Sequence, residues 1–483
     1  MAPQIYKPTI PDVPIVQHSL YSHLFPETPK FPADLPAYVD SFTGTALTRA
    51  TLEDLALKFA QGLITKKKVK RGDTIMVFAQ NSLCWPVVVF GAIAAGLRVT
   101  FAPPISTPDE LKHLYLDSSA YVICTALPHL RTVIKMLQNG VAPSIEEGER
   151  RTIILPDDFN WIPGTPKTRA KNVPGLTTFT DILGFGKLEK PERFDGVDAE
   201  QETAFLCYSA GGPGQPKGVQ TTHQNVTTVL DMISIGFPIL KPESDRMLAV
   251  LPFHDMYGLV KLLLFPFMCG ISTIVMGNFD PIKFCEAVQQ YKATVTLVVP
   301  PALVALSTHD SVKEYDLSSL RVIFSGTSSV GGDLVKTVKN RIRPTNAPAL
   351  QILQGYGLTE TTWGTLSLND ESKYGSVGTL LPNLEARLIV DDRNGKAKTD
   401  DEVVDAKEGE QGEIWVRGRS VMKGYLNNPE ANTKAFHPHT SPPPTKYTPG
   451  SQWFKTGDVG VVDRNGFFSV IDRKNVDQTE AKL

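Results

Sequence analysis

The sequence predicts an α/β protein with two doubly wound α/β subdomains and a small β-barrel. Runs of strand type and runs of helix type alternate in two stretches, at about residues 47–102 and 247–325, which is typical of parallel sheets covered by helices. From about residue 377 the runs become short and are separated by Gly, Asn and Asp, which is typical of a β-barrel. The length of 483 residues also exceeds what one hydrophobic core normally serves.

Five parts are expected along the chain. Residues 1–45 are rich in proline, which favours an extended arm lying on the surface of a larger body. The other predicted parts are an α/β subdomain at 46–230, a second α/β subdomain at 231–376, a β-barrel subdomain at 377–471 and a short tail at 472–483.

The apolar runs place individual strands and helices. The strands expected in the two α/β subdomains are Thr74–Phe78, Arg98–Ala102, Met247–Leu251, Thr294–Val299 and Leu320–Ser325. The helices expected beside them are Pro86–Ala95 and Ile282–Tyr291. Strands of the barrel are expected at Ala386–Val390 and Glu413–Arg417, and a loop insertion at His437–Gly450.

Composition is that of an ordinary globular protein and argues against a nucleic-acid partner. The net charge of -2 shows no basic excess, so no nucleic-acid partner is expected, and the basic cluster Lys66–Arg71 is interpreted as a solvated helix end. The five cysteines form no Cys-x-x-Cys pair and lie in apolar runs, which indicates buried thiols in a reducing compartment.

No secretory signal and no transmembrane segment are expected. The apolar run Met256–Met276 is long enough to suggest a membrane span, but Lys261 and Pro266 interrupt it. A buried helix leading into a strand at Ser272–Met276 explains the run more simply.

The stretch Ala204–Val219 has the pattern of a phosphate-binding loop. A strand-type run, Ala204–Tyr208, is followed at once by a glycine-rich loop around Lys217. Glycines let backbone N–H groups approach an anion closely, and the ammonium supplies the charge that a polyphosphate needs. A helix is expected to follow the loop, with Thr221 and Gln224 in a capping-box arrangement.

Spacing excludes two better-known phosphate loops. A Walker loop needs Gly before its Lys and Ser or Thr after it, and Pro216 and Gly218 stand there instead. A dinucleotide fingerprint needs a third glycine at the position of Lys217. Taken alone, the stretch is equally compatible with a Gly/Pro surface turn.

What remains resembles the phosphate loop of the adenylate-forming (AMP-binding) superfamily, which includes acyl-CoA synthetases, luciferases and peptide-synthetase adenylation domains. The usual form there is Tyr-Ser-Ser-Gly-Thr-Thr-Gly-x-Pro-Lys-Gly-Val, and this chain departs from it at Ala210, Gly212 and Pro213, where three hydroxyls are lost. The resemblance implies that Lys217 is catalytic. It also implies that ATP is contacted by Ser209, Ala210, Gly211, Gly212, Pro213, Gly214 and Lys217.

The stretch Gln354–Glu360, Gln-Gly-Tyr-Gly-Leu-Thr-Glu, matches a second word of the superfamily without a substitution. By this resemblance Thr359 would contact the α-phosphate, and Glu360 would bind Mg²⁺ together with polyphosphate oxygens, both as catalytic residues. The remaining nucleotide contacts implied for this stretch are Gln354, Gly355 and Tyr356, with the ring of the tyrosine suited to stack on a purine. A tight strand-to-loop turn is the alternative interpretation.

A third word, Trp-Phe-x-Thr-Gly-Asp, ends at Asp458 and is followed by Arg473. The resemblance implies that Asp458 accepts hydrogen bonds from the two ribose hydroxyls and that Arg473 contacts the same sugar, since a carboxylate has two acceptor oxygens for a vicinal diol. Alone, Thr-Gly-Asp is also a common hairpin turn. Its value comes from its position as the third word in the order that the superfamily shows.

A carboxylic-acid pocket is implied by weaker matches. The stretch Leu251–Gly258 resembles the segment that shapes the acyl pocket, but an ungapped match puts Asp255 where the family usually has His, with His254 one place earlier. The pocket residues that the resemblance implies are Met256, Tyr257, Gly326, Thr327 and Gly355. The alternative is that Met256 and Tyr257 belong only to the core.

Within the superfamily the chain is most similar to 4-coumarate-CoA ligase-like acyl-CoA synthetases. The resemblance implies a large adenylation domain that activates a carboxylic acid with ATP to an acyl-adenylate and then transfers the acyl group to CoA or another thiol. The alternative is a nucleotide or acyl-adenylate binding protein with impaired catalysis, which the lost loop hydroxyls favour. A dehydrogenase would also fit the α/β pattern, but its fingerprint is missing.

Two expectations concern the end of the sequence. The resemblance stops at Lys474, whereas family members continue into a C-terminal domain with a Lys that completes adenylation, so that domain is expected to be absent. The tripeptide Ala481-Lys482-Leu483 resembles a Ser-Lys-Leu type of peroxisomal address, with the cytoplasm as the alternative location.

Overall fold

The computed structural model describes residues 3–142, 144–167, 175–209, 215–327, 330–342, 349–367, 373–391, 402–437 and 448–474. The chain divides into two compact units, each built from segments that are far apart in the sequence. Unit 1 consists of Met1–Val16, Ser209–Ile239 and Pro281–Leu483, and unit 2 of Gln17–Tyr208 and Leu240–Asp280. The subdomain boundaries expected from the sequence stay a prediction.

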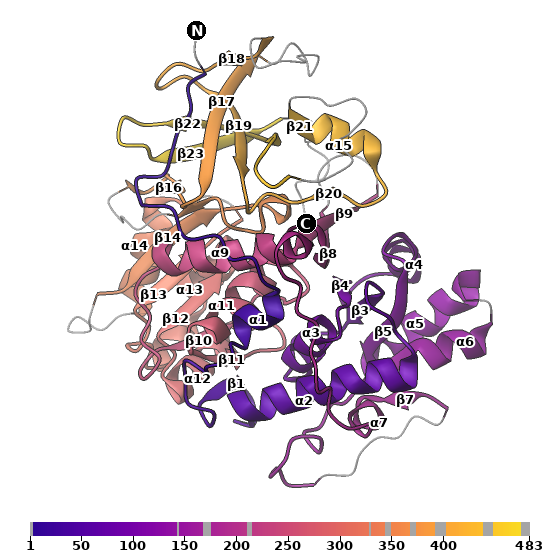
Figure 1. Ribbon diagram of the computed structural model, residues 1–483. Helices are drawn as coiled ribbons and strands as arrows, with labels where there is room; N and C mark the ends of the chain where they lie inside the picture. Colours follow the sequence, from indigo (N-terminus) through magenta and orange to yellow (C-terminus); the bar gives the residue numbers. More distant parts are fainter. Residues whose placement is uncertain are drawn as a thin grey trace. The chain divides into compact units, whose positions relative to one another are not determined.

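Unit 2 contains a parallel sheet with the strand order β8-β4-β3-β5-β6-β7 (Figure 1). The strands are β3 (Thr74–Phe78), β4 (Arg98–Phe101), β5 (Ala120–Ala126), β6 (Thr152–Leu155), β7 (Thr177–Thr178) and β8 (Thr203–Ser209). The order reverses at β3, because β4 lies on one side of it and β5 on the other. This reversal is the mark of a doubly wound sheet, as the sequence predicted.

Helices pack around this sheet and bury the apolar runs. They are α2 (Arg49–Gly62), α3 (Cys84–Ala94), α4 (Pro108–Asp117), α5 (Leu130–Met136), α6 (Ile145–Arg151), α7 (Phe179–Leu183) and α8 (Val197–Gln201). All residues of α3 are buried, which suits a helix that is apolar on every face. The helices α2 and α3 approach closely because Gly91 has no side chain: a Cβ there would lie 2.6 Å from the carbonyl oxygen of Ala56.

The proline-rich N-terminal stretch does more than the predicted extended arm. It contains α1 (Leu20–Leu24) and β1 (Pro36–Asp40), and β1 pairs in parallel with β11 (Ser272–Val275) and antiparallel with β2 (Ala46–Thr48). The strand β11 also pairs in parallel with β10 (Arg246–Ala249). The physical reason is the buried Tyr38, whose hydroxyl donates to the carbonyl oxygen of Leu263 at 2.5 Å. Burial of an aromatic side chain offsets the entropy of ordering the segment.

The apolar run from residue 256 folds as short buried helical segments followed by β11. These segments are α10 (Met256–Gly258), η4 (Leu259–Leu264) and α11 (Phe265–Met268). Within the described ranges, none of the helices combines the length and the apolar character that crossing a membrane requires. Four of the five cysteines are buried as expected, but Cys269 is only partly buried.

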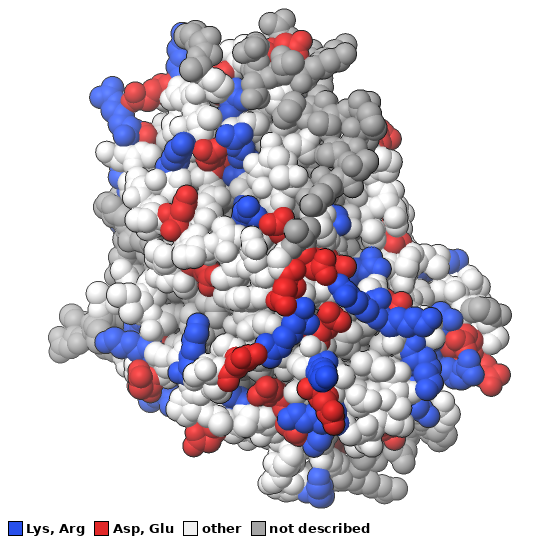
Figure 2. All heavy atoms as spheres, in the orientation of Figure 1, with Lys and Arg blue, Asp and Glu red and all other residues white. Residues whose placement is uncertain are grey.

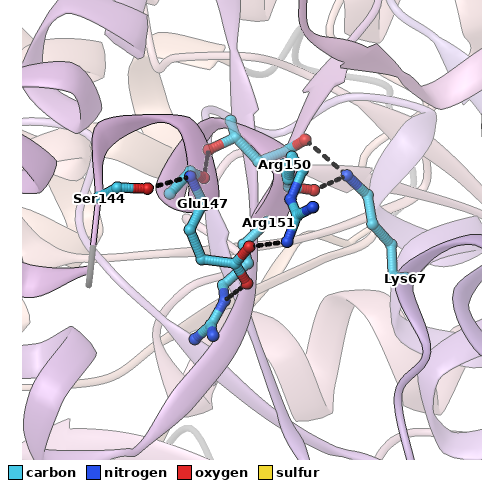
Figure 3. A network of polar contacts seen from close by, with 7 residues as sticks. Lys67, Ser144, Glu147, Arg150 and Arg151 are labelled. Carbon is cyan, nitrogen blue, oxygen red and sulfur yellow. Dashed lines mark hydrogen bonds and ion pairs between the residues drawn. The ribbon is translucent and has the colours of Figure 1, made fainter.

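The basic cluster at residues 66–71 is not uniformly solvated, which corrects the sequence interpretation. Lys67 ends the π-helical segment η1 (Leu63–Lys67) and is buried, with only 6% of its surface exposed. Its ammonium donates to the carbonyl oxygen of Arg150 and to that of Thr152 at 3.1 Å (Figure 3). It also donates to Thr177 Oγ1 at 2.9 Å. The long side chain of Lys67 thereby joins the end of α6 to β6 and β7, a contact that no local sequence pattern reports.

Unit 1 contains a mixed sheet in which β12, β13 and β14 are parallel, and β15 and β16 add antiparallel. Its strands are β12 (Val295–Val298), β13 (Val322–Ser325), β14 (Gln351–Tyr356), β15 (Leu366–Ser367) and β16 (Thr379–Leu380). The helical segments of this part are α12 (Pro281–Tyr291), α13 (Pro300–Thr308), η5 (Asp310–Glu314), α14 (Gly332–Ile342) and η6 (Thr359–Thr361).

The predicted small β-barrel is a curled antiparallel sheet, a half-barrel, whose strands are coloured orange to yellow in Figure 1. Its strands are β17 (Leu384–Asp391), β18 (Val404–Asp405), β19 (Gly412–Gly418), β21 (Phe436–His437), β22 (Trp453–Val462) and β23 (Phe468–Arg473), with α15 (Pro429–Ala435) just before β21. A cluster of Ile389, Val403, Trp415 and Trp453 forms its core, against which Ile5 packs. The central part of the predicted loop insertion, residues 438–447, lies outside the described residues.

The segment after the phosphate loop differs in detail from the expectation. Lys217 begins a strand, β9 (Lys217–Thr222), and the helix α9 (His223–Gly236) follows it. The capping box is formed by Thr222 and Asn225, one residue later than predicted. Thr221 and Gln224 have the same spacing in the sequence as Thr222 and Asn225. The capping pair is decided by where the preceding strand ends, because β9 extends to Thr222 and the helix begins at His223.

Charged side chains of both signs are intermixed over the face drawn in Figure 2. In unit 2, for example, Arg71 lies within 3.6 Å of carboxylate oxygens of Glu192, Asp198 and Glu202. Exposed ion pairs of this kind contribute little to stability, since water screens them.

Candidate functional site

The charged residues that the three sequence words single out lie in unit 1, on four elements. Lys217 begins β9, and this strand pairs antiparallel with the short β20 (Gly424–Tyr425). Glu360 lies in η6, a 3-10 turn that contacts β9. Asp458 lies in β22, and β22 pairs with β23, where Arg473 is the last residue.

The carboxylate of Glu360 is held by two hydroxyl groups. Ser209 Oγ donates to Glu360 Oε1 at 2.7 Å, and the Tyr425 hydroxyl donates to the same oxygen at 2.9 Å. Only 6% of Glu360 is exposed. Two hydroxyls that donate to the same carboxylate oxygen fix the orientation of the carboxylate.

Lys217 lies beside this carboxylate. Its Nζ is 4.5 Å from the centre of the Tyr425 ring, a favourable cation–π distance. Partial burial lowers the pKa of Lys217, whereas the charge of Glu360 raises it. The ammonium is therefore held near an anion.

A second group of contacts surrounds Asp458, of which 5% is exposed. The Tyr356 hydroxyl donates to Asp458 Oδ2 at 2.5 Å, and Arg473 Nη1 lies 3.4 Å from Asp458 Oδ1. Burial raises the pKa of Asp458, and the charge of Arg473 and the hydrogen bond from Tyr356 lower it.

These two groups of contacts form one electrostatic cluster. The charge of Glu360 raises the pKa of Asp458, and the charge of Arg473 lowers the pKa of Lys217. Lys217, Glu360 and Asp458 thus lie in one cluster, although 241 residues (458 minus 217) separate the first from the last. That the cluster binds a nucleotide stays a prediction.

The stretch Gln354–Glu360 is shaped by tight backbone packing. A Cβ on Gly357 would lie 2.7 Å from the backbone of Trp363, so only glycine fits there. The side-chain amide of Gln354 is used internally, because it accepts from Val330 N at 2.8 Å and donates to Val330 O at 3.3 Å. Thr359 opens the 3-10 turn next to Glu360.

The residues proposed for the acid pocket are divided between the two units. Gly326, Thr327 and Gly355 belong to unit 1, whereas Met256 and Tyr257 are buried in unit 2. The pocket assignment stays a prediction.

Thr327 carries a backbone strain that draws attention to the end of β13. Its φ is 76°, a left-handed conformation that is unusual for a β-branched residue. Strain of this kind costs of the order of 1–3 kcal/mol and tends to occur at functional sites.

In unit 2, burial lowers the pKa of His254 to about 4, so this ring is uncharged at neutral pH.

Five of the predicted phosphate-loop residues, Ala210, Gly211, Gly212, Pro213 and Gly214, lie outside the described residues, as do Ala481, Lys482 and Leu483. The loop is bounded on both sides by described parts of the cluster, since Ser209 precedes it and Lys217 follows it.

The donor set suits a metal ion that is shared with phosphate. Glu360 is the carboxylate available, and both hydroxyls bond its Oε1 rather than its Oε2. Among the described residues there is no group of three or more His, Cys, Asp and Glu side chains that would hold a metal by itself. Mg²⁺ usually takes one or two carboxylates and completes its shell with substrate phosphates and water, so the residues present fit Mg²⁺ bound with ATP.

Tyr425 lies outside the three sequence words, although it contacts both Lys217 and Glu360. The only local signal is an aromatic residue directly after Gly424, in a short stretch that also holds the apolar residues Val421, Met422 and Leu426. The pairing of Gly424 and Tyr425 with β9 is a long-range property, so the sequence reading had no means to place the ring there.

Comparison with known proteins gives a consistent result. The family described as "AMP-binding enzyme" matches residues 25–426. 4-Coumarate-CoA ligase 1 of Narcissus pseudonarcissus is 30% identical, with 97% of this chain and 78% of that protein covered. 4-Coumarate-CoA ligase 2 of Nicotiana tabacum is also 30% identical, with the same two coverages.

Solved structures share the fold at lower identity. A long-chain-fatty-acid-CoA ligase (FadD1) from Archaeoglobus fulgidus has a TM-score of 0.79 and 22% identity, with 97% of this chain and 87% of that chain covered. The N-terminal domain of FACL13 from Mycobacterium tuberculosis has a TM-score of 0.73 and 21% identity, with 94% and 99% covered. ATP-bound MatB from Rhodopseudomonas palustris has a TM-score of 0.75 and 20% identity, with 94% and 78% covered.

Proposed function

We propose that this chain activates a carboxylic acid with ATP and passes the acyl group to CoA. The reason is that the chain belongs to the AMP-binding enzyme family and, within it, to the 4-coumarate-CoA ligase-like, adenylate-forming acyl-CoA ligases. A substrate carboxylate oxygen attacks the α-phosphorus of ATP, the bond to the bridging oxygen breaks, and pyrophosphate leaves. The thiol sulfur then attacks the acyl carbon and its proton passes to solvent, while AMP leaves with the electron pair of the broken C–O bond.

The observation that carries this proposal is the convergence of Lys217, Glu360 and Asp458 in unit 1. A cation beside the polyphosphate, a carboxylate for the metal and a carboxylate for the ribose diol are the three charges that an ATP molecule needs along its length. One of the structures with the same fold is described as ATP-bound, which supports the proposal.

The roles follow the chemistry of each group. Lys217 would stabilise negative charge on the phosphates, and the Thr359 hydroxyl would donate a hydrogen bond to the α-phosphate. Glu360 would hold Mg²⁺, which supplies charge neutralisation for the leaving pyrophosphate. Gly326, Thr327 and Gly355 of unit 1 would line the pocket for the acid, which we propose belongs to secondary metabolism.

A second candidate function is supported by the altered phosphate loop. Ala210, Gly212 and Pro213 replace three hydroxyl residues of the usual loop, and Pro213 also lacks an N–H. A chain that binds the nucleotide or the acyl-adenylate but turns over slowly would fit these losses.

ATP–pyrophosphate exchange, measured beside ATP binding, separates the two functions. The 483-residue chain is incubated with labelled pyrophosphate, ATP, Mg²⁺ and a panel of aromatic and aliphatic carboxylic acids. Acid-dependent exchange supports the ligase, and formation of the CoA thioester by the same acid completes the assignment. ATP binding without exchange for any acid supports the binding protein, and no ATP binding overturns both.

We also propose that Ala481-Lys482-Leu483 acts as a peroxisomal address, since it differs from Ser-Lys-Leu by one small residue. A fluorescent protein fused at the N-terminus of the chain should accumulate in peroxisomes, and a variant with Leu483→Asp should remain in the cytoplasm. Cytoplasmic fluorescence with the tripeptide intact would contradict the proposal.

A further inference from the structure

Tyr425 is fixed in place by contacts on its backbone before its side chain reaches the site. Its N–H donates to Asn432 Oδ1 at 2.7 Å, and Asn432 Nδ2 donates to its carbonyl oxygen at 2.9 Å. On either side, Lys423 N donates to Gln220 O at 2.9 Å and Leu426 N donates to Gly218 O at 2.7 Å. The backbone of this residue is therefore anchored to β9, the strand that begins with Lys217.

The side chain of Tyr425 contacts both charged groups of the phosphate end of the site. Its hydroxyl donates to Glu360 Oε1, and its ring face lies under the ammonium of Lys217. Only 6% of Tyr425 is exposed, and burial followed by the charge of Glu360 raises the pKa of its hydroxyl, so the hydroxyl keeps its proton for donation. One side chain thus contacts both the anion and the cation.

The hydrogen bonds on Glu360 leave one carboxylate oxygen for another ligand. Ser209 Oγ and the Tyr425 hydroxyl both bond Oε1, and among the described residues no hydrogen bond to Oε2 occurs. The terminal torsion of a glutamate is broad and nearly free, so a carboxylate needs external contacts to hold one orientation. Two donors on the same oxygen supply that constraint.

We propose that Tyr425 is a positioning residue for the metal–ATP complex, in that its hydroxyl orients Glu360 toward the metal and its ring holds Lys217 toward the phosphates. This inference rests on the proposed function, since it assigns a role toward ATP and Mg²⁺. The two halves of the side chain have separable tasks, because a phenylalanine keeps the ring and loses only the hydroxyl.

Calorimetric titration of ATP tests the inference, with wild-type protein, Tyr425→Phe and Tyr425→Leu compared in Mg²⁺ and in EDTA. Tyr425→Phe should bind ATP about tenfold more weakly in Mg²⁺, which is the usual effect of losing one hydrogen bond to a charged group, and should match the wild type in EDTA. Tyr425→Leu should weaken binding in EDTA as well, because the cation–π contact to Lys217 is lost.

A matched control is Tyr315→Phe, which removes a hydroxyl from another Tyr–Glu pair, formed with Glu286 Oε1 at 3.5 Å. This variant should bind ATP like the wild type under both conditions. Thermal unfolding of each variant shows whether it is folded. Ser209→Ala gives a second test of the orientation of Glu360, because it removes the other donor to Glu360 Oε1. Ser209→Ala should also lower affinity mainly in Mg²⁺.

The outcomes distinguish the inference from the function on which it rests. Wild-type protein that binds ATP, together with a Tyr425→Phe variant of unchanged Mg²⁺-dependent affinity, overturns the inference alone. Equal weakening of Tyr425→Phe in Mg²⁺ and in EDTA also overturns it, since the hydroxyl would then have no metal-specific role. Wild-type protein that binds no ATP overturns the proposed function and the inference with it.

Discussion

The hydroxyl of Tyr356 donates a hydrogen bond of 2.5 Å to Oδ2 of Asp458, across 102 residues of sequence. It joins the residue that we propose stacks on the purine to the carboxylate that we propose binds the ribose. Because Arg473 lies 3.4 Å from the other carboxylate oxygen, Asp458 is oriented from two sides. A preoriented carboxylate loses less freedom when a ligand binds.

Removal of this hydroxyl should weaken ATP binding in a pH-dependent way. Burial raises the pKa of Asp458, and the hydrogen bond from Tyr356 lowers it, so Tyr356→Phe should move the pKa further upward. Protonation of Asp458 removes an acceptor for the ribose hydroxyls, so affinity should fall as the pH decreases, and at a higher pH in the variant than in the wild type. ATP affinity measured from pH 5 to pH 8 checks this. Parallel pH profiles would contradict it.

Loss of the Lys217 ammonium, which we propose stabilises charge on the phosphates, should impair adenylation more than folding. Lys217 is partly exposed and makes no ion pair shorter than 4.0 Å among the described residues, so Lys217→Ala should unfold at nearly the same temperature as the wild type. Removal of one preorganised group that stabilises developing charge should lower ATP–pyrophosphate exchange by about a hundredfold or more. Lys292→Ala, which breaks an exposed ion pair with Asp316, is the control and should keep full exchange.

Restoration of the hydroxyls of the usual phosphate loop should increase the rate of ATP–pyrophosphate exchange. The triple variant Ala210→Ser, Gly212→Thr and Pro213→Thr returns three donors to the loop and one backbone N–H. We expect exchange to rise by about tenfold, with the larger change in kcat rather than in KM if the donors act on the transition state. An unchanged rate would show that the substituted residues do not limit catalysis.

The buried Lys67 should be a strong determinant of stability in unit 2. Lys67→Met leaves the carbonyl oxygens of Arg150 and Thr152 without their shared donor, and we expect a loss of about 3 kcal/mol in the free energy of unfolding. The exposed neighbour Lys66, changed to Met, should stay within about 0.5 kcal/mol of the wild type. Urea unfolding of both variants tests the difference.

The same lysine predicts a pH dependence of stability. Burial lowers the pKa of Lys67 to about 8 from 10.5. Between these values the unfolded chain holds a proton that the folded chain has released, so the stability that this group contributes rises with pH. The free energy of unfolding of the wild type relative to Lys67→Met should therefore increase from pH 8 to pH 10.5. A decrease would mean that Lys67 stays charged in the folded protein.

Several features of the protein were open to prediction because local chemistry determines them. The alternation of apolar runs predicted β3, β12 and β13 to within a few residues, since a buried parallel strand needs a continuous apolar run whatever surrounds it. The three words of sequence identified the family, and Lys217, Glu360 and Asp458 could be named because each carries a charge next to glycines or a turn, where a ligand can approach.

Only the tertiary structure decided which groups hold those charges in place. Tyr425 reaches Glu360 because β20 pairs with β9 across some 200 residues, and Tyr356 reaches Asp458 because two separate sheets of unit 1 bring them together. Lys67 looked like one of several exposed lysines, yet its ammonium is buried against the backbone of α6 and β6. Residue type and periodicity indicate which side chains are apolar enough to be buried and which carry a charge. The partner of a buried polar group depends on contacts between distant segments, and a local sequence pattern does not contain those contacts.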